Sequence, residues 1–538
     1  MLATRDVKHT AEDQMSRLYV PSEAKSQWMH YQNMAHESPD LHLVVETLPP
    51  VGELTREAYL EISRKPGLLA LDVDHAPTDG TCGIRAVPFV VPGGWFNEFF
   101  GWDSYFISIG LLLDDRTDLV QGVVRNWIFE IEHYGLIPNA NRSYLMLRSQ
   151  PPFLTDLCLR LYHATETSDP KAKEFLKRGI KAAIKEYHLV WMTPPRLDKE
   201  TGLSRYWPGG VGVPPEVELD FFAPVLKPFA DKYGTTCEKV VELFNAGEID
   251  EPELEAYFLH DRATRESGHD TQNRLENKTA DLAIIDLNCL LYKFETDIAF
   301  AIHTVFQDDF GESENRPESE FECDLWSSTW HARAEARKAA IDRYLWNEDR
   351  GIYVDYNTRT KRQEAAESAT TLWSMWCGVA SPRQADLVVK RGLPLFECVG
   401  GLASSSKATG FMNTTRPYQC QWDYPHGWAP HQMMAWDGLV RYGYTEVASR
   451  LAYKWLHTIL RVFVDHSGAV LEKYDVTRTT DPHLVDTEYP NQGLQFEGYA
   501  KEGFGWTNAS FAYGLLFVNS RMKHALGIPV PFDILEGL

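Results

Sequence analysis

The sequence predicts a mostly helical protein whose helices are joined by long loops rich in glycine, proline and aromatic residues. After residue 100 the dominant pattern is apolar residues at i, i+3 and i+4, the spacing that places them on one face of an α-helix. Strand-like runs, such as residues 351–357, are short and few. No repeat of fixed period is visible, so the sequence does not support a solenoid.

The first long helix is expected over residues 117–135, with apolar positions near one face: Leu119, Val123, Ile128 and Ile131. Thr117 or Asp118 is expected to cap its N-terminus, and Gly135 to end it. The same spacing predicts further helices over residues 169–191, 327–346, 382–393, 446–463 and 507–522.

The chain divides into two unequal parts. Residues 1–50 are polar and predict a loosely structured arm, and residues 51–538 form the helical domain. No glycine- and serine-rich linker interrupts the second part. A length of 538 residues exceeds a typical domain, but one large enzyme domain can reach it, so length does not require two.

Composition limits the partners. The net charge of −23 disfavours nucleic acid and anionic membranes, because phosphate binding needs clustered Lys and Arg. A neutral small molecule is not disfavoured. Aromatic residues make up 12% of the chain and include 16 Trp, which fits either stacking on sugar rings or simply a large core. Composition alone does not decide between these two interpretations.

Cysteine usage and the first residues favour the cytoplasm. The 8 Cys residues form no C-x-x-C pair, which is typical of reduced thiols in a reducing compartment. The first 21 residues contain no apolar stretch typical of a signal peptide. No run approaches the roughly 18 apolar residues of a membrane span. We therefore expect a cytoplasmic protein.

Several loop-like segments mix carboxylates, amides and arginines with tryptophan, tyrosine and glycine. Sugar hydroxyls need such planar donors and acceptors, and sugar ring faces need aromatic side chains. Any one of these segments could be a surface loop with satisfied charges, but their number on one helical scaffold favours a binding site. The segments are residues 91–106, 139–153, 204–220, 261–274, 419–432, 471–476 and 496–508.

Other chemistries fit poorly. The histidines form no H-E-x-x-H pair, and His269 and His426 are isolated, so no metal is expected. There is no phosphate-binding glycine loop, and Ser267 lacks a G-x-S-x-G context, so no cofactor or serine nucleophile is expected. Paired carboxylates remain, as glycoside hydrolysis requires. Spacing alone cannot select the pair among 76 acidic residues.

Two long motifs and four shorter ones resemble the trehalases of glycoside hydrolase family 37, above all the fungal neutral trehalases. The first family signature, Pro-Gly-Gly-Arg-Phe-x-Glu-x-x-x-Trp-Asp-x-Tyr, is matched by residues 92–105 except for one position. The second, Gln-Trp-Asp-x-Pro-x-Gly-Trp-x-Pro, is matched by residues 421–430. The shorter matches are residues 139–144, 148–153, 266–270 and 502–510. The resemblance covers roughly residues 20–525.

The resemblance implies an all-α fold, an (α/α)6 barrel of six inner and six outer helices, with the pocket formed by loops at one end. It implies hydrolysis of α,α-trehalose to two glucoses with inversion, without cofactor. Asp270 falls on the general acid and Glu472 on the general base. An inverting pair needs carboxyls about 6.5–9.5 Å apart, with the acid protonated near neutral pH and the base ionised.

The resemblance also implies a set of residues that contact a small neutral disaccharide. These are Trp95, Phe96, Trp102, Asp103, Asn141, Arg148, Gln150, Glu216, Trp422, Asp423 and Glu497.

Trp95 departs from the family, which has a sugar-binding arginine at this position. Arginine offers five donors and a permanent charge, whereas tryptophan offers one donor and a large apolar face. Losing a charged hydrogen bond to substrate would cost about 1.5–3 kcal/mol. Three hypotheses follow: a working trehalase with a substitute donor, a glycosidase acting on another α-glucoside, or a catalytically weak relative that binds or senses sugar.

Fungal neutral trehalases also carry an N-terminal extension with a calcium site and phosphorylation sites. Residues 1–50 contain no D-x-[DN]-x-[DN]-G loop, so calcium dependence is not expected here. The sequence does not indicate a regulatory protein partner.

Overall fold

The computed structural model describes residues 15–50, 52–78, 81–93, 96–217, 219–311, 322–412, 420–485 and 503–537. Trp95 and Glu497 therefore lie outside the described residues.

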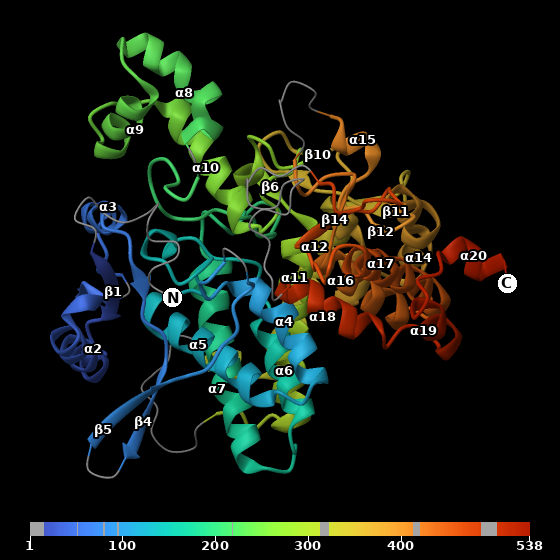
Figure 1. The fold of residues 1–538 in the computed structure, drawn as a ribbon, viewed down its shortest axis with the longest axis horizontal. Helices are drawn as coiled ribbons and strands as arrows, with labels where there is room; N and C mark the ends of the chain where they lie inside the picture. The colour runs from blue at the N-terminus through green and yellow to red at the C-terminus, as the bar shows by residue number, and fades with distance from the viewer. Residues whose placement is uncertain are drawn as a thin grey trace.

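A closed ring of inner helices forms the centre of the molecule (Figure 1). Each helix of the ring contacts the next, and the last packs against the first. In order they are α4 (Gly101–Leu113), α6 (Leu154–Ala164), α11 (Ile285–Phe300), α13 (Trp373–Cys377), α16 (Ala429–Arg441) and α18 (Gly505–Gly514). Residues 101–110 of α4 are all buried, which suits an apolar helix enclosed on every side.

An outer helix follows each inner helix along the chain, so that inner and outer helices alternate. The outer helices are α5 (Thr117–Tyr134), α7 (Pro170–Glu186), α12 (Ser327–Tyr344), α14 (Pro382–Leu387), α17 (Thr445–Asp465) and α19 (Ser520–Leu526). This alternation is the predicted (α/α)6 barrel. Outer helices α5, α7, α12, α14 and α17 coincide with ranges predicted from apolar spacing. The single helix predicted over residues 507–522 is instead divided between inner helix α18 and outer helix α19.

Both ends of α5 test the sequence prediction. Gly135 ends the helix with φ 79, a left-handed conformation that glycine adopts without strain. The predicted N-terminal cap is wrong, because Arg116 occupies the cap position and no side chain caps the helix there.

Small residues allow the inner helices to approach closely. A Cβ atom at Gly110 of α4 would lie 2.8 Å from the Cβ of Ala509 on α18. At Gly438 of α16 it would lie 2.8 Å from the backbone nitrogen of Trp376 on α13. Both distances are too short for a Cβ atom to fit, so glycine is needed where these helices cross.

The expectation of a loosely structured arm is wrong for residues 16–48. Strands β1 (Ser16–Pro21) and β2 (Leu43–Leu48) pair in parallel around helix α2 (Lys25–Glu37). Strand β1 also pairs with β3 (Leu68–Leu69), and its Tyr19 and Val20 are buried. A parallel sheet with buried apolar residues binds this segment to the helical domain.

Three further helices form a projection, whose α8 and α9 stand at the top left of Figure 1. Helices α8 (Leu219–Tyr233) and α9 (Cys237–Ala246) share a separate apolar cluster with the start of α10 (Pro252–Glu266). Helix α10 then runs back toward the barrel.

The remaining elements are short. They are α3 (Arg56–Arg64), β4 (Val73–Thr78), β5 (Thr81–Ala86), β6 (Leu282–Ala283), β7 (Trp346–Asn347), β8 (Ile352–Tyr353), β9 (Tyr356–Asn357), β10 (Arg362–Gln363), β11 (Glu397–Cys398), β12 (Gly401–Leu402), α15 (Lys407–Gly410), β13 (His426–Trp428), β14 (Lys473–Asp475) and α20 (Phe532–Gly537).

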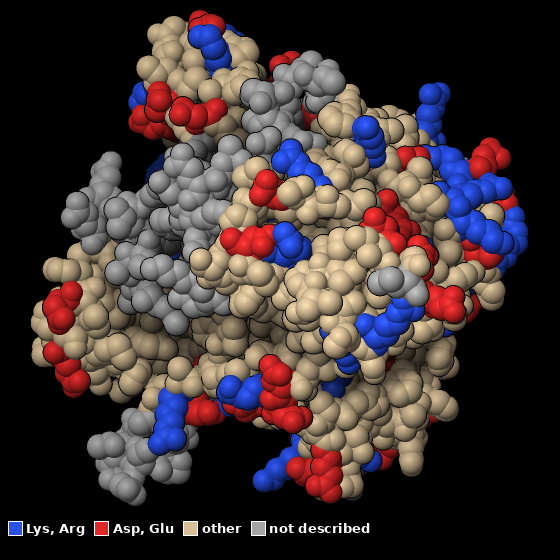
Figure 2. Space-filling model, turned by 45° about the vertical axis from the view of Figure 1, so that its right-hand side comes forward, with Lys and Arg blue, Asp and Glu red and all other residues tan. Residues whose placement is uncertain are grey.

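The surface carries both signs of charge. On the face drawn in Figure 2, Lys and Arg lie beside Asp and Glu. Within the part of the chain that the structure describes, no helix is long and apolar enough to cross a membrane.

Candidate active site

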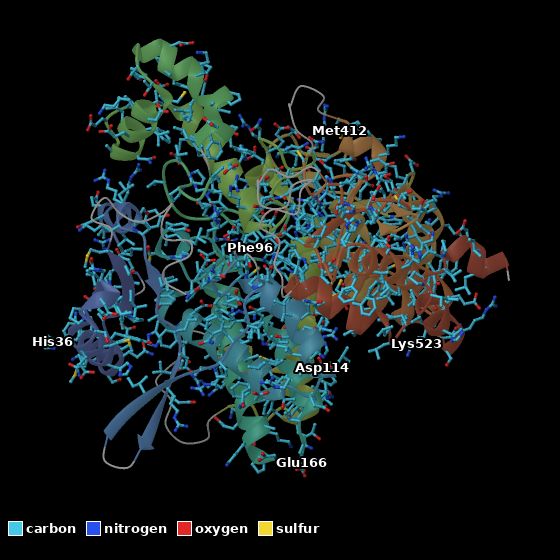
Figure 3. All side chains as sticks on the ribbon, viewed as in Figure 1. His36, Phe96, Asp114, Glu166, Met412 and Lys523 are labelled. Atoms are coloured by element: carbon cyan, nitrogen blue, oxygen red, sulfur yellow. The ribbon has the colours of Figure 1, made fainter. Side chains whose placement is uncertain are left out.

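A cavity of about 930 Å³ opens where several inner helices begin. Trp102 and Asp103 lie in the first turn of α4, Trp428 directly precedes α16, and Trp506 is the second residue of α18. Figure 3 shows Phe96 near the centre of the molecule, whereas Asp114 lies beyond the far end of α4. Helix N-termini carry partial positive charge, so their convergence favours carboxylates in this cavity.

Most residues predicted from the sequence line this cavity. They are Phe96, Trp102, Asp103, Arg148, Gln150, Glu216, Asp270, Trp422 and Glu472.

Two predicted residues, Asn141 and Asp423, are absent from the lining and instead hold loops. The Asn141 Oδ1 atom accepts a hydrogen bond of 2.8 Å from the backbone N–H of Phe99. Its Nδ2 donates to the carbonyl of Leu69 at 3.3 Å. The Asp423 Oδ2 atom accepts from the N–H of Asn273 at 2.8 Å. Their contact with substrate remains a prediction, as does that of Trp95 and Glu497.

Asp270 follows α10 and lies partly buried at the cavity wall. Its side chain is 27% exposed, and an Oδ2 atom lies 3.5 Å from the guanidinium of Arg265. Burial raises the pKa of Asp270 to about 6, against the opposing effect of Arg265 and Arg148. A carboxyl with this pKa keeps part of its proton near neutral pH, which suits a general acid.

Glu472 immediately precedes strand β14, which pairs with β13 so that Trp428 lies opposite Lys473. The carbonyl of Glu472 accepts a hydrogen bond of 3.2 Å from the indole of Trp506. The backbone of the predicted base is therefore held between a strand and the start of α18.

One amide side chain lies between the segments that carry the predicted acid and the predicted base. The Nε2 atom of Gln421 donates a hydrogen bond to the backbone carbonyl of Asp270. Its Oε1 atom accepts a 2.7 Å hydrogen bond from Lys473, the residue after Glu472. The ammonium group of Lys473 also lies 5.0 Å from the ring centre of Trp428. Gln421 thus links the backbone of Asp270 to the side chain of Lys473.

Asp103 is a third carboxyl in the cavity and is only 6% exposed. Burial raises its pKa well above the ordinary value, and the negative charges of Glu472 and Asp270 raise it further. Asp103 therefore favours the protonated form, in which it can donate a hydrogen bond.

Tryptophan rings form one wall. The rings of Trp422 and Trp428 are stacked, with centroids 4.0 Å apart and an angle of 6° between planes. Trp102 lies 5.4 Å from Trp422, and Trp506 meets Trp102 edge-on at 5.7 Å. Mutual packing fixes these rings, so a sugar ring can stack on them with little loss of side-chain entropy.

Ion pairs also line the cavity. Arg148 binds Glu216 at 2.6 Å, and Arg142 binds Glu98 at 2.8 Å. Burial alone would raise the pKa of Glu216, but Arg148 and Arg265 lower it below its ordinary value. The ionised Glu216 can accept hydrogen bonds from sugar hydroxyls.

Several lining residues were not selected from the sequence: Glu98, Arg142, Arg265, Gln421, Trp428 and Trp506. All of them lie inside the motif segments, close to residues that were selected. Within the described residues, no group of three metal-ligating side chains lines the cavity.

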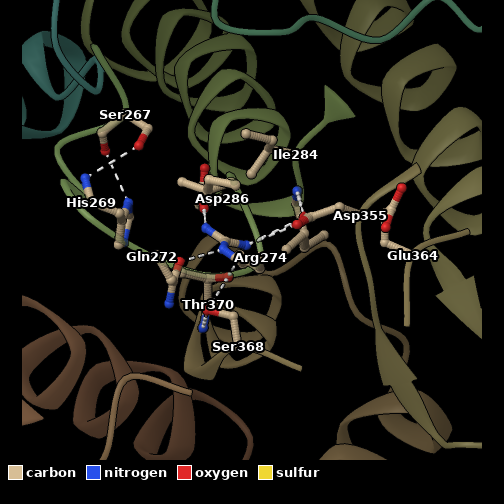
Figure 4. A network of polar contacts seen from close by, with 12 residues as sticks. Ser267, His269, Gln272, Arg274, Ile284, Asp286, Asp355, Glu364, Ser368 and Thr370 are labelled. Atoms are coloured by element: carbon tan, nitrogen blue, oxygen red, sulfur yellow. Dashed lines mark hydrogen bonds and ion pairs between the residues drawn. The ribbon is translucent and has the colours of Figure 1, made fainter. Parts of the chain in front are cut away.

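A buried polar network supports the loop that carries Asp270 (Figure 4). Arg274, only 1% exposed, binds the carboxylates of Asp286 and Asp355. It also donates a 2.6 Å hydrogen bond to Oε1 of Gln272. The Nε2 atom of Gln272 in turn donates to the carbonyl of Trp422 at 2.7 Å. The network therefore joins the loop that carries Asp270 to the tryptophan wall and to the barrel interior.

The comparisons with known proteins agree with this geometry. The trehalase family model matches residues 2–519. The chain belongs to the trehalase family. It is 52% identical over 541 residues to a cytosolic neutral trehalase of Neurospora crassa, covering 99% of this chain and 72% of the relative.

A sequence match and a structure match from Saccharomyces cerevisiae extend the comparison. A cytosolic neutral trehalase is 47% identical over 520 residues, covering 96% of this chain and 68% of the relative. The solved structure of its neutral trehalase Nth1 superposes with a TM-score of 0.87 at 44% identity. That match covers 98% of this chain and 92% of the other, which establishes the (α/α)6 barrel for this trehalase family member.

The Arg274 network generates a stability prediction. In Arg274→Met, Asp286 and Asp355 would remain buried without their cation, so we expect the free energy of unfolding to fall by about 3–5 kcal/mol. The matched control is Arg359→Met, because Arg359 is 80% exposed and lies 3.8 Å from Asp281. We expect a change under about 0.5 kcal/mol in the control. Urea denaturation measures both, and equal losses would contradict the role of the network.

Proposed function

We propose that this trehalase family member hydrolyses α,α-trehalose to two glucose molecules with inversion, using Asp270 as general acid and Glu472 as general base. The observation that supports this most strongly is that both carboxyls line one cavity walled by tryptophan. The raised pKa of Asp270 also fits the acid of such a pair.

In the proposed step, Asp270 gives its proton to the oxygen that joins the two rings. Glu472 removes a proton from a water molecule on the opposite face of the sugar. The water oxygen bonds to the anomeric carbon as the bond from that carbon to the bridging oxygen breaks. One glucose leaves with the proton from Asp270, and the other carries the hydroxyl from water.

The neighbouring groups stabilise the charges that develop in this step. Protonated Asp103 donates a hydrogen bond to a sugar oxygen, and ionised Glu216 accepts from sugar hydroxyls. The inner helices that begin at the cavity turn their partial positive charges toward it, which favours an ionised carboxylate there. No step requires a cofactor.

The substrate class follows from the family, which acts on a disaccharide. Neither the fold nor the relatives favour the alternatives raised by Trp95, namely another α-glucoside or a sugar-sensing protein. The relatives named cytosolic neutral trehalases agree with the cytoplasmic location expected from the sequence.

The catalytic pair generates a direct prediction. Asp270→Asn and Glu472→Gln each remove one proton-transfer group, so we expect each to lower kcat for trehalose by about 100- to 10,000-fold. Glucose release measures the rate. Glu200→Gln is the matched control, since Glu200 is 62% exposed and paired with Lys361 on the surface. Variants of Asp270 or Glu472 that kept most of the activity would refute the assignment.

Arg265 generates a prediction of pH dependence. The Arg265→Met variant removes a cation 3.5 Å from Asp270, which disfavours the ionised carboxylate and raises its pKa. The acid must be protonated to act, so activity is lost as pH rises through this pKa. We therefore expect the alkaline limb of the kcat/KM profile to move to higher pH.

Arg116→Met, which removes an exposed cation 2.8 Å from Asp118, provides the control and should leave the limb in place. A limb that stayed fixed in Arg265→Met, or moved to lower pH, would show that another group is the acid.

A further inference from the structure

A group of three metal-ligating side chains lies outside the catalytic cavity. Their ligand atoms, from His466, Asp481 and His483, all lie within 4.8 Å of one another. The two imidazole rings are 3.9 Å apart between centroids. None of the three lines the cavity that holds Asp270 and Glu472.

Backbone hydrogen bonds fix the segments that bring these residues together. The N–H of His466 donates to the carbonyl of Val462 at 2.9 Å, which places His466 at the end of α17. The N–H of Leu484 donates to the carbonyl of Asp481 at 3.1 Å, which closes a turn around His483. His483 is only 7% exposed, so one of the three ligands is held inside the protein.

We propose that His466, Asp481 and His483 bind one divalent first-row transition metal ion, with zinc as the representative ion. Two imidazole nitrogens and one carboxylate oxygen are ligands typical of zinc. Calcium and magnesium prefer sites made wholly of oxygen atoms, so two imidazoles disfavour them. Three protein ligands leave a tetrahedral position for water.

The proposed metal ligands flank Glu472, the proposed base, along the sequence. His466 precedes Glu472 by six residues and His483 follows it by eleven. Between them, the N–H of Asp475 in β14 donates to the carbonyl of Pro482 at 2.8 Å. A metal ion would therefore close a loop around β14 and stabilise the native segment against local unfolding.

The separation along the sequence explains why the histidine pattern did not reveal this group. Sequence patterns such as H-E-x-x-H contain closely spaced histidines, whereas these ligands come from two segments 15 residues apart. The cluster forms only in the folded chain, where the segment after β14 lies beside the end of α17.

The test is calorimetric titration of ZnCl2 into the full chain after removal of metal by a chelator. We expect one zinc ion per chain for the wild type. In the double variant His466→Gln/His483→Gln we expect affinity to fall by at least about 100-fold, since two of three ligands are lost. Circular dichroism confirms that the variant is folded, and His466→Gln alone serves if the double variant is not.

His303→Gln is the matched control, because His303 also lies beside a carboxylate, 2.9 Å from Asp308, but without a second imidazole. This control should bind zinc as the wild type does. Saturating zinc should also raise the thermal unfolding midpoint of the wild type and leave that of the double variant unchanged. The proposal is overturned if the wild type binds no zinc ion, or if the His466 and His483 variants bind it as tightly as the wild type. Neither readout depends on catalysis, so the result is independent of the assignment of Asp270 and Glu472.

Discussion

The hydrogen bonds of Gln421 constrain the whole site. This one amide donates to the carbonyl of Asp270 and accepts from Lys473, beside Glu472. Asp270 and Glu472, the proposed acid and base, lie about 200 residues apart in the sequence, and inversion requires such a pair to stand on opposite sides of the sugar at a set separation. A planar amide with both functions occupied can hold such a separation, because it rotates only by breaking both bonds.

The barrel supplies the environment that gives these carboxyls different tasks. Helices α4, α16 and α18 all begin at the cavity, so their partial positive charges act on one small volume. Burial acts in the opposite direction and raises the pKa of Asp103 and of Asp270. The nearby arginines then set how far each carboxyl departs from its ordinary pKa. The pKa values of Asp270, Glu216 and Asp103 therefore differ because their surroundings differ.

Much of the fold follows from the sequence, because apolar spacing reports which side of a helix is buried. Helix α5, which carries Val123 and Ile128, was predicted in this way, and its end was predicted from Gly135. The secondary structure of residues 16–48 was not predicted, because a parallel strand of six residues is too short to give a strong apolar pattern.

The motifs indicated most of the residues that line the cavity, but not how they act together. Asn141 and Asp423 lie in motifs yet hold loops, which only their hydrogen bonds reveal. The bridge through Gln421 and the cluster of His466 with His483 join distant segments, and no local pattern encodes such contacts.

The measurement that tests the central claim most directly is the anomeric form of the first glucose released from trehalose, followed by proton NMR before mutarotation. Attack by a water that Glu472 activates, opposite to the oxygen protonated by Asp270, gives one β-glucose and one α-glucose per trehalose. We predict equal initial amounts of the two anomers. Release of α-glucose alone would mean retention of configuration, and would contradict the arrangement of Asp270 and Glu472 as an inverting pair.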